Sequence, residues 1–420
     1  MTLEVYVGQS ALDESGTGTD DLTSPDSTTT PVGVLHCLSR GEINGTSRNS
    51  FDLAIGMADG TIERSISTTA NNEQASDDAT RGLSASVITQ TQPGAQIEQG
   101  ESTHNSFIAG GERVNNTNGY VFAHLCSHMF FAGCNLAVEE VVLNATVDTL
   151  VNVDPGFAWD VVLVMDVRQT AVGLANDNQG SFGFYVKADD AFGCIITDTA
   201  NGAGSPGGPG LIISTTYAGG ATAPGLGTIV YGIDIAAAAG NSADIIPRVA
   251  GGESNLIQLM FIGFTTGESA KIVQWDSPTG LGDNIVTGAG GTPIALIHLL
   301  SRAAAYNVAE ADADAGVYGI SFITPDSQFC VSAANEFATG ANSDTQGMAD
   351  NKSIRVPIHN GTESVTTSFE ATLVSMLSNG WKDNWTSRDS GTARKQLSLA
   401  FLPLPIVNIG AHIKQRLFAT

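Results

Sequence analysis

The sequence TPVGVLHCLSRGE, residues 30–42, is a strand-like phrase that occurs again as TPIALIHLLSRAA at residues 292–304. A less similar copy, FAWDVVLVMDVRQ, lies between them at residues 157–169. The three copies align on their arginines, which are Arg40, Arg168 and Arg302. A repeat of this kind predicts that one structural unit occurs three times in the chain.

The segment that follows each phrase repeats as well. FDLAIGMAD, FGFYVKADD and YGISFITPD begin at Phe51, Phe182 and Tyr318, and in each copy apolar residues follow two and four positions later. This alternation predicts a strand with one buried face, and the closing aspartate predicts a turn. The spacing between copies is 131 and then 136 residues. For a later apolar strand, aligned on Phe130, Phe261 and Phe401, it is 131 and then 140 residues.

We therefore predict three tandem homologous units of roughly 135 residues, the size of one domain each. Their predicted bounds are 1–136, 137–269 and 270–410, followed by an additional C-terminal strand in 411–420. The sequence leaves open whether the units lie in a row or around a pseudo-threefold axis.

The composition favours an all-β protein. Only 15% of the residues are charged, and glycine occurs 48 times. Few lysines and glutamates, many short apolar segments and glycine-rich turns are typical of antiparallel sheets. We predict antiparallel β-sandwich units of jelly-roll type. Residues 231–246 fit a short helix and a strand equally well.

The charge distribution excludes some partners. The formal net charge of −25 disfavours binding to the phosphate backbone of nucleic acids. No apolar run is long enough for a transmembrane helix, and the N-terminal residues do not resemble a secretory signal. We expect synthesis in a cytoplasm and no membrane insertion.

The cysteines are predicted to be small buried thiols. Their number is odd, and they do not recur at matching positions in all three units, unlike a disulfide framework. They are Cys37, Cys126, Cys134, Cys194 and Cys330. A zinc cluster of Cys126, His128 and Cys134 is the alternative, but these residues lie in an apolar strand without a CxxC pair. We favour core packing and predict no metal site.

No catalytic motif is recognisable, and we predict no catalytic residue, no cofactor and no enzyme activity. GAGSPG at residues 202–207 matches a dinucleotide-binding pattern, but its flanking prolines and glycines indicate a loop. Glu310, Asp312 and Asp314 alternate as calcium ligands can, yet the remaining ligands of a calcium loop are missing.

The three aligned arginines allow two interpretations. Each could contact a ligand in its own unit. Alternatively, each could form a structural ion pair at a strand end, with a turn aspartate such as Asp59, Asp190 or Asp326. We favour the structural role for Arg40, Arg168 and Arg302.

One segment could bind a glycan. Sugar rings stack on exposed aromatic side chains, and GWKDNWTSRDSG at residues 380–391 is predicted to be an exposed aromatic loop. Its tryptophans, Trp381 and Trp385, are the candidate glycan contacts.

The duplicated phrases, the Gly-, Thr- and Ser-rich loops and the N-terminus without a signal resemble a virion structural protein of a tailed bacteriophage. The resemblance extends over the whole chain and implies a capsid decoration, tail or fibre component that binds other virion proteins. Alternatives are a phage adhesin that binds a receptor or host-surface glycan, and a polysaccharide-degrading enzyme.

The C-terminus suggests how such a protein could assemble. AHIKQRLF, residues 411–418, is similar to the opening strands of the units, but no unit follows it. It could pair with a sheet of a neighbouring chain through Ala411, Ile413 and Leu417, giving a homo-oligomer. It could equally cover an edge of its own third unit. The first 30 residues hold six acidic and no basic residues, and the last 30 hold four basic and no acidic residues, which would favour head-to-tail contact.

Overall fold

The computed structural model describes most of the chain as β-strands. The described residues are 2–12, 16–39, 47–48, 50–71, 79–92, 97–120, 124–176, 178–199, 210–222, 228–249, 254–309, 316–337, 343–358, 366–388 and 391–404. Within these ranges all regular elements are strands, so the all-β prediction is confirmed. Residues 231–246, for which a helix was possible, lie mostly in two strands. No helix in the described ranges has the length and apolar character needed to cross a membrane.

The strands form three units, and each unit has an inner sheet and an outer sheet. In the first unit, β1, β11, β3, β5, β6 and β7 form the inner sheet in this order, and β2, β10, β9 and β8 form the outer sheet. The strands of this unit are β1 (Glu4–Leu12), β2 (Gly18–Thr23), β3 (Gly33–Ser39), β4 (Ser47–Arg48), β5 (Ser50–Ala58), β6 (Glu63–Asn71), β7 (Ala79–Ser84), β8 (Ile88–Gln92), β9 (Ile97–Ile108), β10 (Gly111–Asn118) and β11 (His124–Ala132).

The second unit has the inner sheet β12-β22-β14-β16-β17-β18 and the outer sheet β13-β21-β20-β19. Its strands are β12 (Cys134–Val142), β13 (Val151–Val153), β14 (Val161–Asp166), β15 (Gly173–Asn176), β16 (Asn178–Val186), β17 (Ala191–Thr199), β18 (Gly210–Ser214), β19 (Gly219–Thr222), β20 (Ile229–Ala237), β21 (Ala243–Arg248) and β22 (Leu256–Phe264).

The third unit has the inner sheet β23-β32-β25-β26-β27-β28 and the outer sheet β24-β31-β30-β29. Its strands are β23 (Ser269–Asp276), β24 (Gly282–Thr287), β25 (Ala295–Ser301), β26 (Gly316–Ile323), β27 (Gln328–Phe337), β28 (Ser343–Asp350), β29 (Ile354–Ile358), β30 (Thr366–Leu377), β31 (Gly380–Ser387) and β32 (Lys395–Leu402). The same strand order thus occurs three times. The descent of the units from one repeated sequence, and the predicted bounds between them, remain predictions.

The three similar phrases occupy the same place in the three inner sheets. They form β3, β14 and β25, each of which pairs with the last inner strand of its own unit. In that pairing Gly33, Val161 and Ala295 lie opposite Phe131, Ile262 and Phe401. The strand pairing therefore gives the same alignment of the three phrases as their arginines do.

Two details of the predicted repeat are wrong. Phe401 lies at the position of Phe131, not of Phe130, and a shift of one residue moves a side chain to the other face of a sheet. The turn aspartates are not equivalent either. The strand pairing places Asp59 first, Asp190 fourth and Asp326 third in their four-residue hairpin turns.

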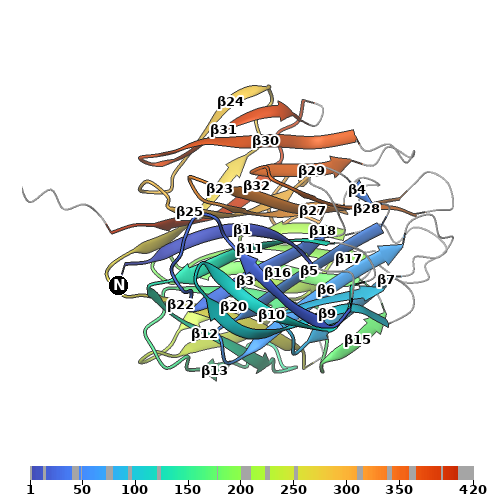
Figure 1. Ribbon diagram of the computed structural model, residues 1–420, viewed down its shortest axis with the longest axis vertical. Coiled ribbons are helices and arrows are strands. Elements are labelled where there is room, and N and C mark those ends of the chain that lie inside the picture. Colours follow the sequence, from blue (N-terminus) through green and yellow to red (C-terminus); the bar gives the residue numbers. More distant parts are fainter. Residues whose placement is uncertain are drawn as a thin grey trace, which may run out of the picture.

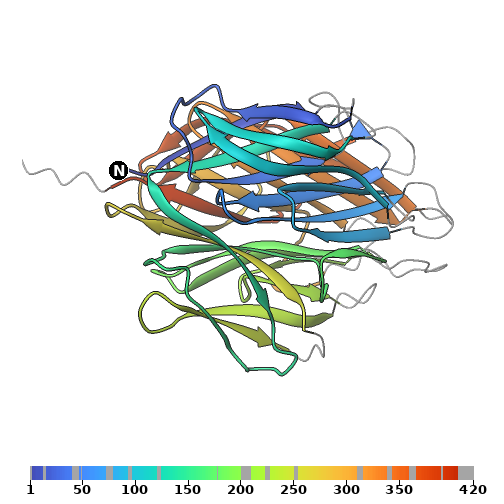
Figure 2. The same cartoon turned by 60° about the horizontal axis from the view of Figure 1, so that its bottom comes forward.

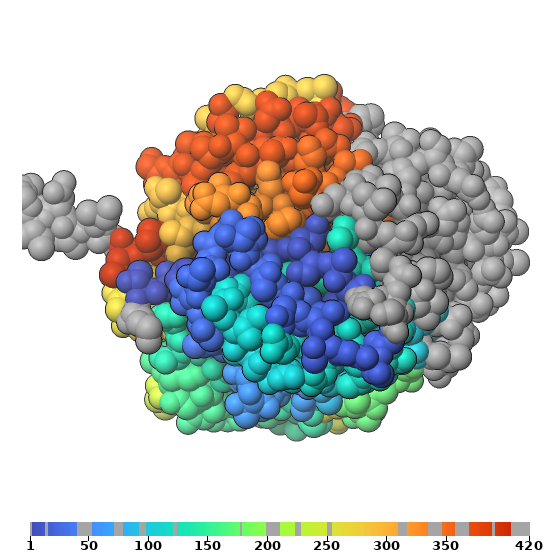
Figure 3. Space-filling view, viewed as in Figure 1, coloured from blue at the N-terminus to red at the C-terminus, as the bar shows by residue number. Residues whose placement is uncertain are grey.

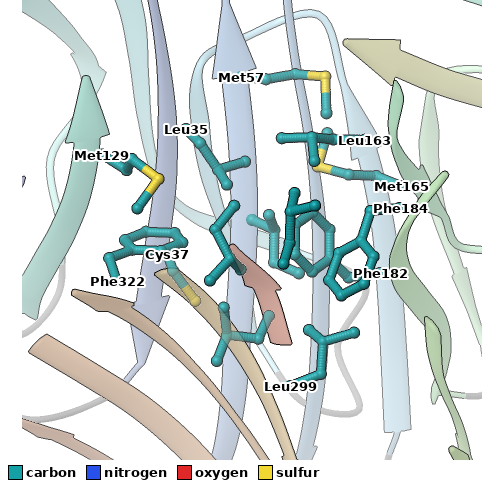
Figure 4. Close-up of a cluster of buried hydrophobic side chains, with 14 of the residues drawn as sticks. Leu35, Cys37, Met57, Met129, Leu163, Met165, Phe182, Phe184, Leu299 and Phe322 are labelled. Atoms are coloured by element: carbon teal, nitrogen blue, oxygen red, sulfur yellow. The ribbon is translucent and has the colours of Figure 1, made fainter. Parts of the chain in front are cut away.

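The inner sheets are buried on both faces. One face of each packs against its own outer sheet, around Phe130, Trp159 or Trp381. The opposite faces of all three inner sheets meet in one central core. Figure 4 shows part of this core, where Leu35, Met129, Leu163, Phe182 and Phe322 lie close together from different units. Strands buried on two faces read as continuous apolar runs, as the inner strands here do.

The three units surround this central core. In Figure 1 the third unit, in orange and red, lies at the top, the second unit, mainly in green, extends to the bottom, and the first unit, in blue and cyan, lies in front. Figure 2 shows the same grouping after rotation, with the first and second units at opposite sides. On the face shown in Figure 3, side chains of the first unit lie directly against those of the other two.

Short segments at equivalent positions connect each unit to another one. β4 follows the phrase strand of the first unit and pairs with β28 of the third. β15 follows the phrase strand of the second unit and pairs with β7 of the first. After the phrase strand of the third unit, Asn307 donates its N–H to the carbonyl oxygen of Ile213 in β18 of the second, at 2.9 Å.

The first strands of the units make contacts in the same cyclic direction. β1 lies against β27 of the third unit, and β23 lies against β16 and β17 of the second. In β12, Glu140 accepts a hydrogen bond from Arg64 of the first unit at 2.8 Å, and the N–H of Val138 donates to Asp59 at 2.8 Å. Head-to-tail contacts that return to their starting unit form a closed ring. The arrangement is therefore pseudo-threefold and not linear.

Candidate functional site

Arg168 and Arg302, two of the repeated arginines, lie at the beginning of the segments that contact another unit. Arg40 lies outside the described residues. Arg168 has a left-handed backbone, with φ of 50°, and its N–H donates to Asp166 Oδ1 at 2.8 Å. Arg302 is 7% exposed, so its side chain is almost completely buried. Arg168 is next to Gln169, which contacts the first unit, and Arg302 precedes Asn307, which contacts the second unit.

A buried polar network surrounds Arg168 at the boundary between the first and second units. Arg81 of β7 and Arg168 both donate to Gln179 Oε1, at 3.1 and 3.4 Å. Gln169 donates to the carbonyl oxygen of Arg81 at 3.1 Å, which joins the two units directly. These contacts support the structural interpretation of Arg168, while a ligand role stays untested.

Asp166 is the buried carboxylate of this network. It accepts a hydrogen bond from the hydroxyl of Tyr231. Burial raises the pKa of Asp166 to about 6, although Tyr231 and the two nearby arginines act in the opposite direction. The carboxylate therefore carries a cost in stability at neutral pH that an exposed aspartate would not have.

A small pocket lies where strands of the three inner sheets meet. Its lining is mainly aliphatic and aromatic, from β5, β6, β16, β17 and β26. The lining residues are Leu53, Ile55, Ile66, Thr68, Gly180, Ser181, Phe182, Ile195, Thr197, Tyr318 and Ile320. None of these residues carries a carboxylate, an imidazole or an amine, so the pocket is a continuation of the central core.

The most concentrated set of titratable side chains lies inside the first unit, between its two sheets. His36 of β3 and His128 of β11 are directly opposite each other in the strand pairing, and their ring centroids are 5.6 Å apart. Cys126 precedes His128 by two residues on the same strand and therefore shares its face. Its Sγ lies 3.7 Å from His36 Nδ1. We call His36, Cys126 and His128 the histidine–cysteine cluster.

Glu112 of β10 connects the cluster to the outer sheet. Its carboxylate contacts His36 Nε2 at 2.6 Å and His104 Nδ1 at 2.5 Å. Burial raises the pKa of Glu112, but the two histidines more than offset this effect, and the net shift is downward. Hydrogen bonding and charge attraction to Glu112 raise the pKa of His104 despite its partial burial. Glu112 is therefore a buried carboxylate held in its charged form.

The cluster itself is fully buried. Its three side chains are at most 1% exposed. Burial lowers the pKa of His128 well below its usual range, and the charge of His36 acts in the same direction. Burial also raises the pKa of the Cys126 thiol. Within the described part of the chain, this is the group of His, Cys, Asp and Glu side chains whose ligand atoms lie close enough to share an ion, all within 4.8 Å of one another.

The sequence pointed to only part of this cluster. Cys126 and His128 were considered together with Cys134, but Cys134 belongs to β12 and its side chain lies in the central core. The third member is His36, which only the pairing of β3 with β11 brings close. The prediction of buried thiols is confirmed, because all five cysteines are buried and none forms a disulfide.

The predicted exposed aromatic loop is wrong. Trp381 and Trp385 lie in β31, at 0% and 2% exposure, and pack in the core of the third unit. Lys382 and Asn384 alternate with them and contact Asp283 on the neighbouring strand. Because the indole rings point inward, they are not available to stack on a sugar ring.

The remaining predicted residues lie outside the described ranges. These are Ala411, Ile413 and Leu417 of the predicted C-terminal strand, and Glu310, Asp312 and Asp314 of the predicted acidic loop.

Comparison with known proteins adds no relative: no protein-family model matches the chain, and no curated protein matches it.

Proposed function

We propose that the protein is a structural component of a virion, in the class of capsid decoration or tail proteins of tailed bacteriophages, and that its role is non-catalytic. The observation that carries the proposal is the closure of three sandwich units into one ring within a single chain. Such a body is suited to occupying a fixed position in a particle.

The shared core supports a rigid body. Domains joined only by linkers move relative to one another unless their interface is large and hydrophobic. Here all three inner sheets contribute to one hydrophobic core, and short strands of one unit extend the sheet of another. Rotation of one unit against the others would separate apolar side chains and break strand pairing, so the units are expected to act as one body.

The pseudo-threefold arrangement of the three units supports the proposal. Protein shells and tails are symmetric assemblies, and a subunit with matching symmetry can make three similar contacts at once. A ring of three similar units fits a threefold position, or a sixfold position in two orientations. The three outer sheets are the surfaces that the ring presents laterally to such neighbours.

Assembly with further copies of the chain is part of the proposal. The contacts that hold the units together are used within one ring, so self-association needs another surface. The predicted C-terminal strand with Ala411, Ile413 and Leu417 would provide it by pairing with a sheet of a neighbouring chain. Light scattering behind a sizing column, on the full chain and on a chain ending at Pro405, tests this point. We expect an oligomer for the full chain and a monomer for the shorter one, and monomers in both cases would contradict it.

The virion role is tested on particles. Particles are purified from cells infected with the phage that encodes the chain, and from cells infected with a phage whose reading frame carries an early stop codon. Mass spectrometry should find the protein in the first particles at a copy number set by the particle symmetry, and in the second only after recombinant protein is added. Protein that stays in the lysate and never sediments with particles would overturn the proposal.

A further inference from the structure

Three potential metal ligands meet in the core of the first unit without a catalytic or ligand-binding role in the proposed function. We propose that the histidine–cysteine cluster is a structural binding site for Zn²⁺, with His36, Cys126 and His128 as its protein ligands. Imidazole nitrogen and thiolate sulfur are the ligands that zinc prefers in structural sites.

The strand pairing places the three ligands correctly for a shared ion. His36 and His128 face each other across β3 and β11, and Cys126 is the diagonal neighbour of His36 on the same face. The 3.7 Å between Cys126 Sγ and His36 Nδ1 is close to the separation of two zinc ligands. With Zn–S of about 2.3 Å and Zn–N of about 2.1 Å, tetrahedral geometry gives roughly 3.6 Å. Three protein ligands leave one position of a tetrahedral Zn²⁺ open.

The outer contacts of both histidines orient their inner nitrogens. His36 Nε2 contacts the Glu112 carboxylate at 2.6 Å. In the neutral tautomer that donates from Nε2 to this carboxylate, Nδ1 presents its lone pair toward Cys126. A carboxylate behind a histidine is the usual support of a zinc ligand. His128 Nε2 contacts Ser10 Oγ at 3.1 Å, while His128 Nδ1, fully buried, has no hydrogen-bond partner. A buried nitrogen without a partner carries a desolvation cost, which coordination to a metal would remove.

The second unit shows that the fold does not need polar side chains here. In the second unit Val164 and Leu259 form the pair that corresponds to His36 and His128. In the third unit the pair is His298 and Ser398, which hydrogen-bond each other at 2.7 Å, with Trp275 packed beside them. The complete ligand set thus occurs in the first unit, at a place where the second unit is wholly apolar. Burying three polar side chains there lowers the stability of the fold unless hydrogen bonds or a metal ion compensate for the lost hydration.

The raised pKa of the buried Cys126 thiol does not oppose the proposal, because a coordinated thiol loses its proton to the metal. Burial does affect how the ion is loaded. The ligands are at most 1% exposed, so the metal has to enter while the first unit folds. The full chain is therefore produced with the metal in the medium, and is not loaded after folding.

The test measures metal content and the environment of the metal. The full chain is expressed in minimal medium with Zn²⁺ or with Co²⁺ and purified without a metal-affinity tag. We expect close to one equivalent of metal per chain by elemental analysis. The cobalt form should show the visible absorption of a tetrahedral site and a thiolate-to-cobalt charge-transfer band.

Two variants identify the ligands, and one serves as a matched control. C126S removes the thiolate with little change in volume, and H128L introduces the leucine that the second unit has at this position. Both should lose at least tenfold in bound metal, and C126S should lose the charge-transfer band. C37A changes the neighbour of His36 on β3, whose side chain lies in the central core, and should keep both signals.

The metal content of wild type and of the variants distinguishes a zinc site from a packed polar core. If wild type binds no metal during expression, or if C126S and H128L retain full occupancy, the proposal is wrong and the cluster is a packed polar core. H128L is informative even if C126S fails to fold, because leucine fits the same position in the second unit. The result does not depend on whether the protein belongs to a virion.

Discussion

Phe131 and Phe401 meet edge to face in the central core, with their ring centroids 5.7 Å apart. They occupy equivalent positions in the last inner strands of the first and third units, and both are fully buried. Their contact shows that the core between the units is built like the interior of a domain. The stability of one unit should therefore depend on side chains of another.

This coupling can be measured with a double-mutant cycle. F131A and F401A should each lower the free energy of unfolding by about 3–5 kcal/mol, as expected for a buried phenylalanine. The double variant should lose roughly 0.5–1.5 kcal/mol less than the sum, because the ring contact is counted twice in that sum. Urea denaturation followed by circular dichroism gives these values.

The control pair is F131A with F261A, since Phe261 lies in the separate core of the second unit. Its effects should add within about 0.5 kcal/mol. Additivity in the test pair as well, or a separate unfolding transition for each unit, would argue against a shared core.

Asn307 holds the third unit against the second through its side chain as well as its backbone. Its Oδ1 accepts hydrogen bonds from Ser214 Oγ and from the N–H of Thr215, and its Nδ2 donates to Thr215 Oγ1, each at 2.9 Å. Its backbone is left-handed, with φ of 61°. We predict that N307A destabilises by about 2 kcal/mol and N307G by about 1 kcal/mol, because glycine adopts this conformation without strain.

Thermal and urea unfolding of both variants would check the order. N152A is the control, because Asn152 makes an exposed hydrogen bond to Asp244 within the second unit, and a loss below about 0.5 kcal/mol is expected. Equal losses for N307A and N307G would mean that the left-handed backbone carries no cost for alanine.

The sequence predicted the strands better than it predicted which way they face. The phrase strands were found because their apolar runs repeat together with an arginine, and their place in the inner sheets matches. The error at Phe401 has a physical cause, since β32 is buried on both faces and its sequence gives no alternation to fix the register. The closed ring was not predictable, because it depends on pairing between strands of different units, such as β15 with β7.

The site residues show the same limit. The spacing of Cys126 and His128 was visible, but His36 is remote in sequence, and only the pairing register brings it opposite His128. The segment around Trp381 was interpreted as a loop because it contains several polar residues. In the structure these alternate with the tryptophans along β31, apart from Asp383, which is buried between them.

Trp381 and Trp385 should behave as core residues and not as a binding surface. We predict that W381A and W385A each destabilise by about 3–5 kcal/mol, because each removes a large buried ring. The four tryptophans of the chain are at most 7% exposed, so acrylamide should quench their fluorescence weakly. Saturation with a host-surface glycan should leave the emission unchanged. Strong quenching, or a change of emission on glycan addition, would place an indole at the surface and contradict the packing of β31.

Asp383 gives the stability of the third unit a dependence on pH. Ser353 Oγ donates to Asp383 Oδ1 at 3.0 Å, but burial is the larger effect and raises the pKa of this carboxyl to about 6. In the unfolded chain its pKa is about 3.9. Below pH 4 both states hold the proton, and Asp383 causes no difference. Between about pH 4 and pH 6 the folded state keeps a proton that the unfolded state releases, so stability falls as the pH rises.

Above pH 6 the cost is constant, and two pKa units correspond to at most about 3 kcal/mol. D383N removes the charge and keeps the shape, and its amide can accept the same hydrogen bond from Ser353. We therefore predict that D383N is more stable than wild type at pH 7.5, by about 1–3 kcal/mol, and that the difference shrinks steadily as the pH falls to 4. D283N is the control, because hydrogen bonds from Asn384 and Lys382 hold the pKa of the exposed Asp283 low. Loss of the Asp283 charge should therefore be slightly destabilising at neutral pH. Urea denaturation at several pH values gives both curves. A D383N variant less stable than wild type at pH 7.5 would show that the charged carboxylate is well solvated or paired in the folded protein.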